Sequence, residues 1–98
     1  MKAYELYFYR TEVLEPLQRK LEAEAAEAAE ADYRAWKAYE AMTDEEYMQD
    51  AAAYDAHVDE TSKRAQLLSF QYESACKAVE AILALELEAD YLEGVGLI

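Results

Sequence analysis

Apolar and small residues recur along this chain at alternating intervals of three and four positions, the spacing that places them on one face of an α-helix. One series runs without a slip through Tyr47, Ala51, Tyr54, Val58, Thr61, Ala65, Leu68, Tyr72, Ala75, Val79 and Ile82. An earlier series, interrupted at Glu24, runs through Leu14, Leu17, Leu21, Ala28, Ala31, Ala35, Ala38 and Met42. The pattern therefore predicts two apolar seams on helices that pack against partners.

Residues that break helices lie only near the two ends of the chain. Pro16 is the one proline, and the two glycines, Gly94 and Gly96, come after a long span of good helix formers. A first helix is predicted over 12–41. Gly94 marks the end of the last helix near residue 93, because glycine readily adopts the left-handed conformation that follows a helix.

A second helix start is marked at residue 44. Thr43 is followed three residues later by Glu46, which is the pattern of a capping box. Residues 59–62 (Asp-Glu-Thr-Ser) favour caps and turns, so a break is expected there. With that break the chain is a small three-helix bundle; without it, a long antiparallel helical hairpin. Compactness favours the bundle, and the unbroken seam favours the hairpin.

The prediction is thus an all-α fold of about three helices at 12–41, 44–58 and 62–93, forming a single domain over 1–98. Residues 1–11 are a candidate N-terminal extension. They alternate like a short strand but also fit helical spacing, and with no second strand in view we expect a helical extension bent near Pro16.

Charge limits the classes of function. The chain has 22 acidic and 9 basic residues, a net charge of −13. Direct binding to nucleic acid or anionic lipid is disfavoured, because phosphate affinity comes from clustered cations. No apolar run is long enough to span a membrane. A single cysteine, Cys76, allows no internal disulfide, and a cytoplasmic location is expected.

The sequence offers few candidate catalytic residues. His57 is the only histidine, so a metal site of paired histidines and carboxylates is not expected. Cys76 has no adjacent base to activate it. No glycine-rich phosphate loop exists before Gly94. We therefore predict no enzyme activity, no metal and no cofactor.

Acidic residues concentrate in one stretch, and we predict that they form a partner-binding face. Residues 43–62 carry seven acids and no Lys or Arg: Asp44, Glu45, Glu46, Asp50, Asp55, Asp59 and Glu60. The alternative is a solvated face with the usual preference for acids at a helix start, which explains Asp44 to Glu46 but not the later ones.

Aromatic residues give a second candidate surface. The chain has nine tyrosines and one tryptophan, more than a core of this size requires. Tyr and Trp are frequent anchors of protein interfaces. The second-choice contact residues are Tyr4, Tyr7, Tyr9 and Trp36. Packing at the edges of a bundle is the alternative explanation.

In size, helical content and acidity the chain resembles the phage-made inhibitors of restriction or CRISPR systems that mimic DNA, although no motif carries the resemblance. It implies an inhibitor that occupies the basic, nucleic-acid-binding groove of a partner protein. The alternatives are a homo-oligomeric scaffold protein and an antitoxin-like regulator of a basic partner. Exposed seams or aromatics also lead us to expect a homodimer.

Overall fold

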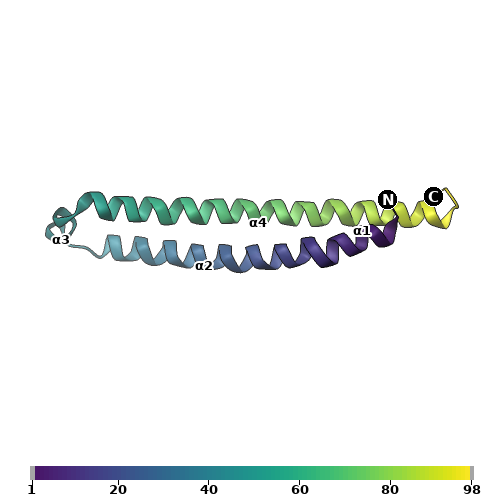
Figure 1. The fold of residues 1–98 in the computed structure, drawn as a ribbon. Helices are drawn as coiled ribbons and strands as arrows, with labels where there is room; N and C mark the ends of the chain where they lie inside the picture. Colours follow the sequence, from purple (N-terminus) through teal and green to yellow (C-terminus); the bar gives the residue numbers. More distant parts are fainter. Residues whose placement is uncertain (1, 98) are drawn as a thin grey trace. The chain divides into compact units, whose positions relative to one another are not determined.

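The structure is a computed structural model that describes residues 2–97. Its elements, which Figure 1 shows in chain order, are α1 (Ala3–Tyr9), the π-helical turn η1 (Arg10–Leu14), α2 (Glu15–Glu40), α3 (Asp44–Gln49) and α4 (Ala51–Gly94). No strand occurs within residues 2–97. The all-α prediction is confirmed, and residues 3–9 are helical.

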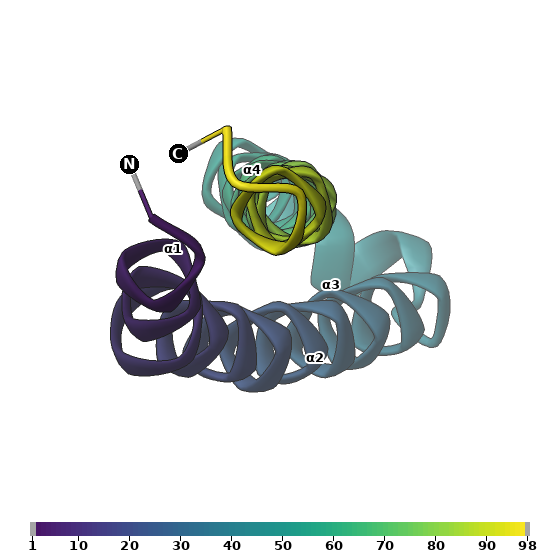
Figure 2. The ribbon, with the colours of Figure 1, turned by 90° about the vertical axis from the view of Figure 1, so that its right-hand side faces the viewer.

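Contacts divide the chain into two compact units. The terminal unit comprises residues 2–21 and 71–97, and the central unit comprises residues 22–70. Each unit is an antiparallel pair of helical segments. In the terminal unit, α1 lies beside the C-terminal end of α4, where the Ala3 N–H donates to the Glu93 carboxylate at 3.1 Å (Figure 2).

The second long helix is continuous, so the break expected at 59–62 is wrong. Thr61 and Ser62 direct their hydroxyls to the Asp32 carboxylate of α2 at 3.0 and 2.9 Å. The Thr61 hydroxyl also lies 3.0 Å from the Val58 carbonyl, a bond that an α-helix accommodates. The break comes earlier, at Asp50, whose backbone is not helical (φ −154°, ψ 59°).

The seam predicted on α3 and α4 is confirmed throughout. Each of its members from Tyr47 to Ile82 is buried or half-buried. The same three-four spacing then continues through Glu86, Ala89 and Glu93. None of the described helices, α4 included, has an apolar stretch sufficient to cross a bilayer.

On α2 the predicted seam is only half right. The residues spaced by seven from Leu14 to Met42 are buried or half-buried, as expected. Of the intervening positions, Glu24 is half-buried in its predicted place. The other three, Leu17, Ala31 and Ala38, are exposed, and the residues that follow the four intervening positions are half-buried: Gln18, Ala25, Asp32 and Tyr39. Three of these four are polar, and each of the three has a hydrogen-bond partner on α4. Choosing seam residues by hydrophobicity alone therefore missed the adjacent residues of α2 that pack against α4.

Where a bend near Pro16 was predicted, the structure has the π-helical turn η1. Proline has no backbone N–H, and its ring crowds the carbonyl four residues earlier. One wider turn just before Pro16 relieves that conflict without ending the helix, which continues as α2. A described helix thus extends from Ala3 to Glu40 and begins before the predicted residue 12.

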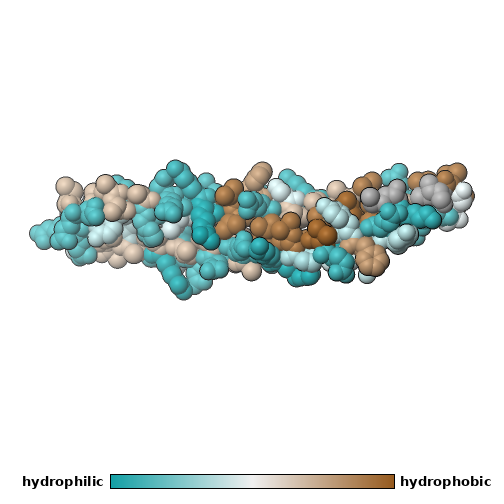
Figure 3. Space-filling view, viewed as in Figure 1, coloured by the Kyte–Doolittle hydropathy of each residue, from teal (hydrophilic) through white to brown (hydrophobic). Residues whose placement is uncertain are grey.

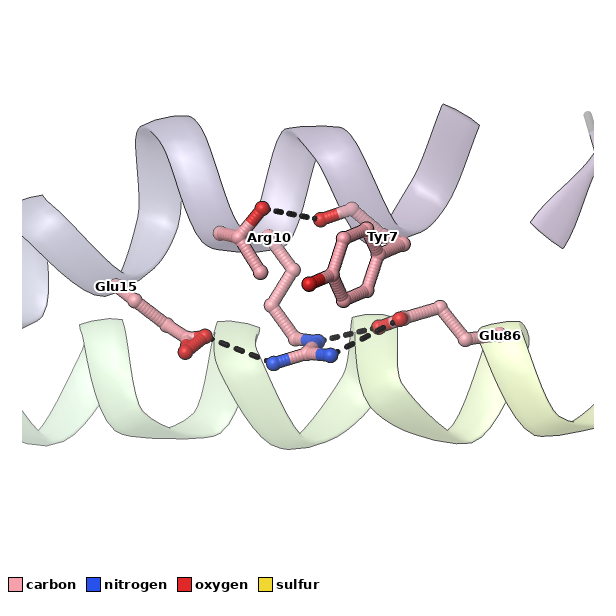
Figure 4. A network of polar contacts seen from close by, with 5 residues as sticks. Tyr7, Arg10, Glu15 and Glu86 are labelled. Carbon is pink, nitrogen blue, oxygen red and sulfur yellow. Dashed lines mark hydrogen bonds and ion pairs between the residues drawn. The ribbon is translucent and has the colours of Figure 1, made fainter. Parts of the chain in front are cut away.

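A buried ion pair connects the two arms of the terminal unit (Figure 4). Arg10 donates through Nε and Nη2 to the two carboxylate oxygens of Glu86, and the bond from Nη2 is 3.1 Å long. Its Nη1 donates to the Glu15 carboxylate at 2.7 Å. The Arg10 and Glu86 side chains are only 16% and 10% exposed. The hydrogen bond to Glu86 raises the pKa of Arg10. Glu86 occupies a seam position, so this pair forms a polar layer within the packing.

We predict that Glu86→Ala lowers the free energy of unfolding by about 2 kcal/mol, because a mostly buried guanidinium loses its bidentate partner. Urea denaturation measures the change. Glu30→Ala is the matched control: it removes the exposed Glu30–Arg34 pair and should cost under about 0.5 kcal/mol. Equal costs for the two variants would show that the Arg10–Glu86 pair does not hold the terminal unit together.

Candidate protein-binding face

All seven acids of the predicted face belong to the central unit, and all seven are exposed. Asp44, Glu45 and Glu46 form the first turn of α3. The predicted cap is present, because the Thr43 Oγ1 accepts a hydrogen bond from the Glu46 N–H at 3.2 Å. In Figure 3, which is viewed as Figure 1, the surface around α3 is teal and pale brown, without the deep brown of strongly hydrophobic residues.

The acids of α4 separate onto two flanks of the central unit. Asp55 and Asp59 line a shallow groove of about 260 Å³ together with Trp36 of α2. Glu60 lines a different groove of about 280 Å³, beside Glu27 and Arg64. The structure therefore brings together two of the predicted acids and one of the predicted aromatics. We call the first groove, lined by Trp36, Tyr39, Asp55, Val58, Asp59 and Ser62, the Trp36 groove.

Three aromatic rings form a ladder at the Trp36 groove. Trp36 and Tyr39 pack edge to face with ring centroids 5.7 Å apart, and Tyr39 packs in the same way on Tyr47 at 5.6 Å. The Tyr39 hydroxyl donates to Asp55 at 3.2 Å, and the Tyr47 hydroxyl lies 3.1 and 2.9 Å from the two Asp55 oxygens. Residues of α2, α3 and α4 thus meet at one carboxylate.

Tyr39 and Tyr47 were not among the predicted site residues. The three-residue spacing of Trp36 and Tyr39 places them on one side of α2, which was visible in the sequence. Their contact with Tyr47 and Asp55 depends on the turn between α2 and α3, and no local pattern revealed it.

A hydrogen-bonded chain fixes the tryptophan. The Trp36 Nε1–H donates to Ser62 Oγ at 3.0 Å, and the Ser62 hydroxyl donates to the half-buried Asp32 at 2.9 Å. Because the indole N–H is satisfied internally, the exposed part of Trp36 is its apolar ring face and edge, at 43% residue exposure. A rigidly held, partly exposed tryptophan is suited to contact a partner.

The acids of this face are largely uncompensated by cations. Asp59 pairs with Lys63 at 2.8 Å, and this contact raises the pKa of Lys63. Within residues 2–97 the other six acids of the face have no ion pair with Lys, Arg or His. By sequence the central unit carries 13 acidic and 4 basic residues, a net charge of −9, against −4 for the rest of the chain.

The aromatic residues of the second-choice surface do not form one cluster. Tyr4, Tyr7 and Tyr9 lie on α1 in the terminal unit and are 62%, 52% and 48% exposed. Arg10 lies over the Tyr7 ring, 5.4 Å from its centroid. Trp36 belongs to the central unit and groups with acids instead of with these tyrosines.

His57 and Cys76 occupy separate surroundings. His57 is exposed and lines an apolar groove of about 460 Å³ with Ala31, Ala35 and Tyr54. Cys76 is half-buried in the terminal unit and accepts a hydrogen bond from Gln18 Nε2 at 3.3 Å. Among the residues that the structure describes, no three potential metal ligands gather at one point.

No protein-family model, curated protein or solved structure matches this chain.

We predict that Asp55→Asn lowers the pKa of Tyr47 from about 12 toward the ordinary 10.0, because the hydrogen bond to the Asp55 carboxylate is the main cause of the raised value. Alkaline titration of phenolate absorbance, taken as the difference between each protein and its Tyr47→Phe counterpart, isolates this group.

The sign of the stability effect follows from the same shift. A folded-state pKa above the unfolded value means that the contact stabilises the fold fully below about pH 10 and stops doing so as the pH rises through about 12. A Tyr47 midpoint that does not move in Asp55→Asn would contradict the assigned contact.

Proposed function

We propose that this chain is a protein-binding module that inhibits a partner by occupying the basic groove where that partner holds nucleic acid. The observation that carries the proposal is the uncompensated charge of the central unit, in which six of the seven predicted contact acids are exposed and lack a cationic partner within residues 2–97. The helix start accounts for Asp44 to Glu46, and the tyrosine hydrogen bonds account for Asp55, but neither accounts for Glu60. Like charges one helical turn apart, such as Asp55 and Asp59, cost a few tenths of a kcal/mol.

The spacing of the charges sets how much of a nucleic acid the face imitates. Residues four apart on a helix are separated by about 6 Å along its axis. One DNA strand carries a charge about every 3.4 Å. The acids of α3 and α4 are therefore sparser than phosphates, and they correspond to part of one strand. The exposed Glu22, Glu27 and Glu40 of α2 add charge to the same unit.

The Trp36 groove supplies the specific part of the contact. An arginine or lysine of the partner would meet a carboxylate from Asp55 or Asp59 and the face of an aromatic ring at once. Both interactions favour a cation, and the second favours arginine because a planar guanidinium stacks on aromatic rings. Long-range attraction from the remaining acids would raise the association rate.

Two other functions use the same features differently. An antitoxin-like regulator would also bind a basic partner through the central unit, but nucleic acid need not compete for that partner. A homo-oligomeric scaffold would use apolar surface, and the terminal unit exposes a good deal of it. Competition by duplex DNA for a captured partner separates the inhibitor from both alternatives.

We predict that Asp50→Asn, Asp55→Asn and Asp59→Asn together weaken binding of an oligo-arginine peptide about tenfold, since three exposed pairs at roughly 0.5 kcal/mol each amount to about 1.5 kcal/mol. Trp36 is the only tryptophan and lies in the groove, so its fluorescence reports the binding. Added salt should weaken binding to the parent more steeply than to the triple variant.

The matched control is a second triple variant, Glu73→Gln, Glu80→Gln and Glu88→Gln, which removes the same charge from exposed positions of α4 in the terminal unit. It should weaken binding by less than about threefold, because distant exposed charges are screened. If the two triple variants weaken binding equally, only net charge matters, and the central unit has no specific face.

A further inference from the structure

The chain exposes more surface than a folded monomer of its mass should. Its accessible area is 7223 Å². A compact protein of 11.2 kDa is expected to expose about 5700 Å². The excess of about 1500 Å² exceeds the roughly 800 Å² that each partner contributes to a standard protein interface. Among the described residues, twelve of the seventeen exposed large apolar side chains lie in the terminal unit.

Part of this apolar surface is ordered as a stripe. Tyr9, Val13 and Leu17 are each four residues apart, so they lie above one another on the same flank of the first helical arm. They are 48%, 49% and 43% exposed. A residue at the edge of a helix pair is typically about half exposed, because one side of it packs against the partner helix and the other side faces outward.

The second arm contributes a matching stripe. Arg10 and Glu86 bind each other across the two arms, and Tyr9 and Leu85 stand one residue before them. In an antiparallel helix pair, residues that precede matched packing positions lie on the same flank, so helix geometry places Leu85 on the flank of Tyr9. Leu85 is 48% exposed. Ala78 and Leu92 stand seven residues before and after it, so the α4 stripe is apolar over two heptads. The two stripes together form the Leu85 flank, made of Tyr9, Val13, Leu17, Ala78, Leu85 and Leu92.

We infer that the Leu85 flank is covered by a second copy of this chain. A two-fold interface places the same patch on both sides, so the patch must be complementary to itself. The Leu85 flank meets that requirement because its six residues carry no charge. Elsewhere two chains of net charge −13 repel each other, and the terminal unit is the less acidic unit. The helix pairs of two terminal units would then meet as a four-helix arrangement with a widened apolar core.

The test compares two leucines of the same helix. Leu85→Glu places a carboxylate in the interface twice, once from each copy, and should raise the dimer dissociation constant at least about a hundredfold. Leu87→Glu adds the same charge two residues away, where Leu87 is more exposed (66%) but points off the flank. It should change the dissociation constant by less than about threefold. Sedimentation equilibrium of the full chain measures both.

A third variant, on the other arm, tests the same flank without relying on a change in α4. Val13→Ser changes the facing arm at a half-exposed position and should also weaken the dimer, while circular dichroism establishes that each variant keeps its helix content. A parent chain that sediments as a monomer at micromolar concentration overturns the inference, as does an effect of Leu87→Glu equal to that of Leu85→Glu. Neither result bears on the binding of the oligo-arginine peptide, so the proposed function stands or falls separately.

Discussion

Alanine fills much of the surface between the helices, and alanine packs closely without determining how far one helix has slid along the other. Of the eight buried apolar residues, four are alanines, and no large side chain among the described residues is fully buried. Register must therefore come from directional contacts. Arg10 with Glu86, Gln18 with Cys76, and Asp32 with Ser62 provide it, because each is satisfied in only one alignment of the arms.

The same contacts shape the surface available to partners. Asp32 positions Ser62, which holds Trp36 at the edge of its groove, and Asp55 gathers two tyrosines from α2 and α3. Polar groups that align the central unit thereby also orient the aromatic rings beside its exposed acids. In the terminal unit the aligning pair is nearly buried, and this unit carries twelve of the seventeen exposed large apolar residues. The central unit carries the larger net charge, −9 against −4.

Periodicity predicted the α4 seam, and the capping pattern predicted the start of α3, because each depends on local spacing or on one cap. The last helix ends at Gly94, close to the predicted residue 93, but the glycine with the left-handed backbone is Gly96 (φ 77°) and not Gly94 as predicted. Periodicity misplaced half of the α2 seam. Gln18, Asp32 and Tyr39 look like surface residues, and only their partners on α4 explain why they face inward. The acids of the candidate face were evident from composition. Their division between two flanks, and the joining of Asp55 to Tyr47, depend on tertiary contacts that no sequence window contains.

The wider turn η1 adds one residue to the three-four spacing of the packing positions on the first helical arm, which comprises α1, η1 and the start of α2. One row of buried or half-buried positions advances there as Ala3, Leu6, Arg10, Leu14 and Gln18, with three successive steps of four, and Thr11 and Glu15 beside this row are half-buried too. Removing one residue between Arg10 and Leu14 would restore the alternation of three and four, so the arm could wind as an ordinary α-helix with Leu6 and Arg10 still close to the packing surface. A deletion elsewhere in the arm would instead rotate everything before it by about 100°. Among descendants of this sequence, the loss of a residue should therefore be tolerated better in η1 than in the regular helix beside it.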